Sequence, residues 1–138
     1  MKSKGFTLIE LLAVIVILAI IALIATPIVL GIIEDSKNNA NRISAGYMVD
    51  AVEKAYSMAY TKNMGAIPTL EAIAEEFDMN GAEWTTDANG NQVVQTTDGE
   101  VVCNVNVSES GTQLSVVCDG FDDLRSETME IFTNGAAE

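Results

Sequence analysis

The sequence has no histidine and only two cysteines among its 138 residues. Without histidine, the usual Ser-His and Cys-His nucleophile pairs and all histidine-containing zinc sites are excluded. Two cysteines cannot supply the four ligands of a structural zinc ion. No glycine-rich phosphate loop is present either. We therefore expect a protein that is not an enzyme and that holds no cofactor and no metal.

Basic residues are scarce as well. Seven lysines and arginines stand against twenty acidic residues, which gives a formal net charge of −13. From Met64 to the C-terminus there are fifteen acidic residues and a single base, Arg125. A body of this charge repels phosphate backbones and anionic lipid headgroups. We expect no direct binding of nucleic acid.

One long stretch of the chain carries no charge at all, from Leu11 to Ile33. A helix of this length reaches about 34 Å, enough to cross a hydrocarbon core of about 30 Å. Lys2 and Lys4 precede the stretch, and the positive-inside rule then keeps the N-terminus in the cytoplasm. The pattern predicts a single membrane span with the rest of the chain outside.

Glu10 lies at the entrance of this span. A carboxylate in hydrocarbon costs several kcal/mol unless another group pairs with it. Either Glu10 has a specific partner, or it reaches back to the membrane surface and has no special role.

Residues 4–12 read KGFTLIELL and are followed by the apolar run. This string resembles the N-terminus of the type IV prepilin family, over about the first 35 residues. The resemblance implies a leader of residues 1–5, cleavage by a membrane peptidase between Gly5 and Phe6, and methylation of the new amino group on Phe6. It also implies an assembly charge pair, in which Glu10 of one subunit neutralises the amino terminus of its neighbour.

The function implied by the resemblance is that of a pilin, a structural subunit that polymerises into an extracellular type IV pilus. Its partners would be further copies of the chain, the prepilin peptidase and the pilus assembly machinery, with the membrane as its location before assembly. The alternative is a pseudopilin or minor pilin of a type II secretion or DNA-uptake system. An ordinary secretory signal and an uncleaved anchor are two further interpretations of the span, although Ala22–Ala25 offers the signal only a poor cleavage site.

Pro27 and Gly31 interrupt the helix-forming pattern inside the span. Proline lacks an amide hydrogen and leaves the carbonyl four residues earlier without its helical partner, so we expect a kink or a loosened turn. The resemblance implies a helix that can melt just before Pro27 in the filament. A gentle bend without a mechanical role is the other interpretation.

The pattern predicts an α+β fold, with the long helix packed against a small antiparallel meander in a head of residues 34–138. The helix is expected to continue from Glu34 to about Asn63, where Gly65 and Pro68 follow. A narrow stripe at three- and four-residue spacing is its predicted core face. The stripe consists of Ile43, Tyr47, Ala51, Val52, Ala55, Met58 and Ala59.

A second helix is predicted over Leu70–Phe77 with Thr69 as its cap. Four strands are then expected near 83–88, 91–97, 100–108 and 112–118, separated by Asn-Gly, Asp-Gly and Ser-Gly turns. A short helix is predicted over Leu124–Phe132. Residues 87–91 faintly resemble a calcium loop with oxygen ligands, but a hairpin turn explains the Asn-Gly pair better.

The last hairpin allows a further prediction. If Ser110-Gly111 is its two-residue turn, Cys103 faces Cys118, and two pairs of apolar residues fall on the same face of the sheet. An even number of cysteines in an exported domain favours a disulfide. We expect a Cys103–Cys118 bond, and the alternative is two reduced thiols buried in the core.

Overall fold

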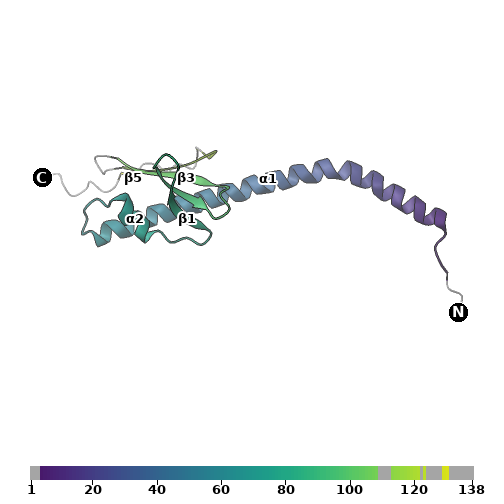
Figure 1. The fold of residues 1–138 in the computed structure, drawn as a ribbon, viewed down its shortest axis with the longest axis horizontal. Coiled ribbons are helices and arrows are strands. Elements are labelled where there is room, and N and C mark those ends of the chain that lie inside the picture. The colour runs from purple at the N-terminus through teal and green to yellow at the C-terminus, as the bar shows by residue number, and fades with distance from the viewer. Residues whose placement is uncertain (1–3, 109–112, 122, 124–128, 131–138) are drawn as a thin grey trace. The chain divides into compact units, whose positions relative to one another are not determined.

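The computed structural model describes residues 4–108, 113–121, 123 and 129–130. The chain forms two compact units, Met1–Asn39 and Ala40–Glu138. A single helix, α1, spans Leu8–Lys62 and is shared by the two units (Figure 1). The helix bounds confirm the prediction of one long N-terminal helix ending near residue 63.

In the first unit, α1 is apolar on all sides. Its large apolar side chains between Leu11 and Ile33 are 48–78% exposed. Among the described residues, α1 is the one helix that is long and apolar enough to cross a membrane, judged by length and composition. The helix continues without a break through Pro27 and Gly31. Just before the proline, the Thr26 hydroxyl donates a hydrogen bond of 2.6 Å to the carbonyl of Ala22.

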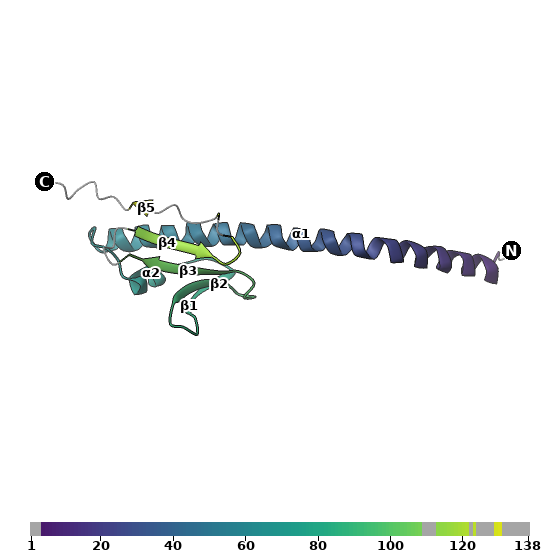
Figure 2. The same ribbon diagram turned by 90° about the horizontal axis from the view of Figure 1, so that it is seen from above.

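The second unit contains a short helix and an antiparallel sheet. Helix α2 covers Leu70–Glu76, and the Thr69 hydroxyl accepts a hydrogen bond from the amide of Ala72, which confirms the predicted cap. The strands follow one another in chain order across the sheet, as Figure 2 shows for β1 to β4. They are β1 (Ala82–Thr86), β2 (Gln92–Thr96), β3 (Val102–Val107), β4 (Gln113–Cys118) and β5 (Met129–Glu130).

The fifth strand corrects the sequence analysis. The helix expected over Leu124–Phe132 is wrong at Met129 and Glu130, which pair antiparallel with Leu114 and Gln113. The remaining residues of that range lie outside the described part of the chain. A strand here satisfies backbone groups at the edge of β4, and short tertiary pairings of this kind override local helix propensity.

The core lies between α1, α2 and the sheet. The buried residues of α1 are Ala45, Met48, Val49, Val52, Ala55, Tyr56 and Ala59. They pack against Ile73 of α2 and against valines and the cysteines of β2, β3 and β4. The predicted core stripe is therefore right at Val52, Ala55 and Ala59.

The same stripe is wrong at three large residues. Ile43 is 59% exposed, Tyr47 is 62% exposed and Met58 is 42% exposed. A helix turns by about 100° per residue, so these three positions point away from the face centred on Val52. Alanines and valines occupy that face instead, together with Met48 and Tyr56.

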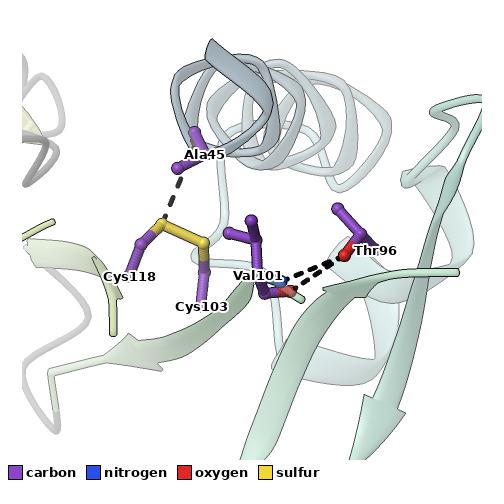
Figure 3. Close-up of a disulfide and its surroundings, with 5 residues drawn as sticks. All are labelled: Ala45, Thr96, Val101, Cys103 and Cys118. Atoms are coloured by element: carbon purple, nitrogen blue, oxygen red, sulfur yellow. Dashed lines mark hydrogen bonds between the residues drawn. A yellow bond between two sulfur atoms is a disulfide. The ribbon is translucent and has the colours of Figure 1, made fainter. Parts of the chain in front are cut away.

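The hairpin of β3 and β4 has the predicted register. Cys103 pairs with Cys118, Val105 with Val116, and Val107 with Leu114. The Ser110-Gly111 turn lies outside the described residues. The two cysteines form a disulfide, both are fully buried, and the sulfur of Cys118 lies 3.9 Å from the carbonyl oxygen of Ala45 on α1 (Figure 3). The alternative of two reduced thiols is therefore excluded in this structure.

We predict that replacing both cysteines by alanine lowers the free energy of unfolding by about 3 kcal/mol, because the bond closes a loop with a sequence separation of 15. The measurement is urea unfolding of the full chain in detergent, followed by tryptophan fluorescence of Trp84. The wild-type chain with its disulfide intact is the control. An unfolding midpoint equal to that of wild type would contradict a stabilising role for the bond.

Candidate functional site

The predicted functional residues at the start of the chain meet around the first turn of α1. The helix begins at Leu8, so Thr7 occupies the N-cap position and Glu10 is the third helical residue. The Thr7 amide donates a hydrogen bond of 2.9 Å to Glu10 Oε2. In return, the Glu10 amide donates to Thr7 Oγ1 over 3.3 Å. This reciprocal pair is a capping box, in which two otherwise unpaired amides at the helix start are satisfied.

The capping role of Glu10 was not predicted from the sequence, although the Thr-x-x-Glu spacing at residues 7–10 is its signal. The Thr7 hydroxyl also donates to Glu10 Oε2, over 3.0 Å. All side-chain contacts of the carboxylate thus go to Oε2. Within the described residues Oε1 makes no hydrogen bond, so half of the carboxylate is available to a group from outside the chain.

Gly5 and Phe6 lie just before the helix and are open to their surroundings. Phe6 is 90% exposed. A Cβ placed on Gly5 would meet no atom within 4 Å. Packing in the described chain therefore gives no reason for a glycine at this position, and any requirement for glycine comes from a partner.

The other predicted positions are separate from this cluster. Pro27 and Gly31 lie farther along the uncharged part of α1, and a Cβ on Gly31 would also meet no atom within 4 Å. Cys103 and Cys118 lie in the buried face of the sheet. The structure thus joins Glu10 to Thr7 by hydrogen bonds, leaves Phe6 exposed just before them, and gives the remaining positions no contact with this pair among the described residues.

The loop at residues 87–91 is a turn held by its own hydrogen bonds. Asp87 Oδ1 accepts from the amides of Asn89 and Asn91, each over 2.8 Å, and Oδ2 accepts from the Asn91 side chain over 3.0 Å. These bonds, first that from the Asn91 side chain, lower the pKa of Asp87 below its ordinary value. The arrangement explains the carboxylate as a turn-forming group, in agreement with the hairpin interpretation.

Comparison with known proteins agrees with this geometry. Residues 1–26 match the family model described as the prokaryotic N-terminal methylation motif. The chain is also 36% identical over 96 residues to the type IV narrow pilus major component PilA5 of Thermus thermophilus. That alignment covers 67% of this chain and 78% of the relative. The chain belongs to the type IV pilin family. No solved structure gives a significant match.

Membership of the pilin family accounts for the architecture described above. A pilin combines an apolar N-terminal helix with a small α+β head, and this pilin has both within its described residues. The family consists of structural subunits, which is the role that the resemblance of residues 4–12 implied.

We predict that replacing Thr7 by alanine in this pilin accelerates hydrogen exchange of the Glu10 amide about fivefold, because loss of an N-cap costs about 1 kcal/mol. The measurement is exchange of the full chain in detergent micelles, read residue by residue by NMR.

Replacing Thr26 by alanine is the matched control, because its hydroxyl bonds a carbonyl in mid-helix and caps nothing. Equal exchange of the Glu10 amide in the Thr7 variant and in wild type would show that the capping box contributes nothing in the micelle.

Proposed function

We propose that this pilin is a structural subunit that is cleaved after Gly5, methylated on the amino group of Phe6, and polymerised through α1 into an extracellular type IV pilus. The relative from Thermus thermophilus is named as the major component of a pilus. That name supports a major subunit over the alternative of a pseudopilin or minor pilin in a secretion or DNA-uptake system.

The observation that carries the proposal is the uncovered apolar half of α1. The 23 residues from Leu11 to Ile33 contain no charge, and the described part of the chain buries none of the most apolar stretch of this helix. Water is a poor solvent for so large an apolar surface. A bilayer can cover it before assembly, and the apolar helices of neighbouring copies can cover it in a filament.

The division of the chain follows from this proposal. Residues 1–5 form a leader that carries Lys2 and Lys4 and remains in the cytoplasm. Residues 6–33 span the membrane and later form the filament core, and residues 34–138 lie outside. The partners are the prepilin peptidase, which requires the glycine at position 5, the assembly machinery and other copies of the chain.

Glu10 sets the register of assembly in this scheme. Its Oε2 is already occupied by Thr7, while Oε1 remains able to accept a hydrogen bond from the Phe6 amine of a neighbouring copy. Removal of one member of a buried charge pair typically costs about 3–5 kcal/mol. A copy that inserts out of step leaves both charges unpaired and is therefore rejected.

Pro27 and Gly31 mark the place where the filament helix can bend or loosen. Pro27 provides no amide for the carbonyl of Leu23, and glycine at position 31 has a lower helix propensity than any other residue except proline. In the free subunit the helix is continuous at both positions. Loosening in the filament would make the pilus extensible.

We predict that Glu10→Ala reduces the yield of sheared surface filaments by at least roughly a hundredfold, because the amine of Phe6 then lacks its partner at the cost given above. Electron microscopy and the mass of pelleted filament protein measure the yield. Glu34→Ala, at the other end of the uncharged run, is the matched control and should assemble normally. Normal filament yield from Glu10→Ala would remove the assembly role.

The N-terminal mass of surface material provides the second test. We expect chains that begin at Phe6 and carry one additional methyl group, as abundant components of the sheared fraction. Surface material that still begins at Met1 would overturn the proposed processing. Correctly processed chains at trace abundance would favour the minor or pseudopilin role.

A further inference from the structure

The second half of α1 carries an apolar surface that the head does not use. Ile43, Tyr47 and Met58 point away from the core and are 42–62% exposed. Met58 lines a shallow groove of about 360 Å³, which we call the Lys54 groove. Its lining residues are Lys54, Ser57, Met58, Thr61 and Lys62. Lysines of this kind cover apolar surface with their hydrocarbon stems while the ammonium group stays in water.

The cations of the head differ in whether they have partners. Arg42 forms an ion pair with Asp123, and Lys62 forms one with Glu76. Lys54 is exposed and makes no ion pair within the described residues. Asp50 lies one turn before Lys54 on α1, but the two form no ion pair within the described residues. The groove therefore presents an exposed ammonium group without an ion pair beside an apolar wall.

Three carboxylates of the sheet and its turns are engaged by their own chain. Glu83 accepts a hydrogen bond from the Gln95 side chain, Asp87 is held in its turn, and Asp98 accepts from the Glu100 amide. Helix α2 presents two carboxylates one turn apart on the same face. Glu71 and Glu75 on this helix are exposed and have no hydrogen-bond or ion-pair partner among the described residues.

The Lys54 groove adjoins α2 of its own chain at one end only. Lys62 lines the groove, also lines the pocket between α1 and α2, and pairs with Glu76 of α2. Lys54 and Thr61 lie nearly opposite Ala59, which borders the α2 pocket, at about 100° per residue. The Lys54 end of the groove is therefore directed away from the chain's own α2.

We propose that the Lys54 groove binds the acidic helix α2 of a second copy of this chain, with Lys54 pairing with Glu71 of that copy. The contact rests on the proposed function, since it is a contact between subunits of the filament. The two surfaces are unlike each other, so the contact is head-to-tail and continues from subunit to subunit instead of closing a dimer. The complementary charges fix which faces meet, and the apolar wall around Met58 is covered when they do.

The test is a charge exchange in the full chain, measured as the yield of sheared filaments. We expect Lys54→Glu to lower the yield at least roughly tenfold, because two carboxylates then face each other. Adding Glu71→Lys should restore the yield. Lys54→Glu with Asp119→Lys is the matched control, since it has the same net charge but changes an exposed carboxylate away from α2. This control should remain defective.

Each outcome decides the proposal. Unchanged yield from Lys54→Glu, beside normal wild-type filaments, would overturn the contact and leave the proposed function intact. Equal rescue by Asp119→Lys would show that net charge alone matters, and failure of rescue by Glu71→Lys would exclude α2 as the occupant. A wild-type chain that forms no filaments would overturn both proposals. Melting curves of all variants show whether the head is folded, which the exposure of all three positions leads us to expect.

Discussion

An uncharged helical surface that water solvates poorly is the constraint on which this pilin depends. The chain has no element in its described part that covers residues 11–33, and a helix of this length matches the thickness of a bilayer. Either lipid or identical helices can cover this surface and shield it from water. The proposed filament follows from this property, because identical helices are one of the two surroundings that can cover the apolar surface.

The polar groups at the start of this helix are largely paired within the chain itself. The capping box of Thr7 and Glu10 satisfies two backbone amides and one carboxylate oxygen within a single chain. The second oxygen has no hydrogen bond among the described residues. The carboxylate is therefore stabilised within the single chain, and it keeps the capacity to accept a further hydrogen bond.

In the head, a small sheet packs on one face of α1. Alanines at positions 45, 55 and 59 allow close approach, and the buried Cys103–Cys118 bond joins the two central strands beneath Ala45. Burial of both sulfurs protects the bond from reductants in the folded state. The Lys54 groove lies on another face of α1, and it is there that we propose a contact with a second copy.

Local patterns in the sequence were sufficient for the elements whose causes are local. The uncharged run determined the long helix, Thr69 determined the start of α2, and the alternation around Cys103 and Cys118 determined the register of the last hairpin. The Thr-x-x-Glu spacing at residues 7–10 also predicts the capping box. Three features depended on the tertiary structure. Strand β5 exists because the edge of β4 accepts it. The exposure of Tyr47 and Met58 follows from which face of α1 the sheet covers. The ion pairs of Arg42 with Asp123 and of Lys62 with Glu76 join residues from different elements. Each of these is set by contacts between residues far apart in the chain, which no local pattern specifies.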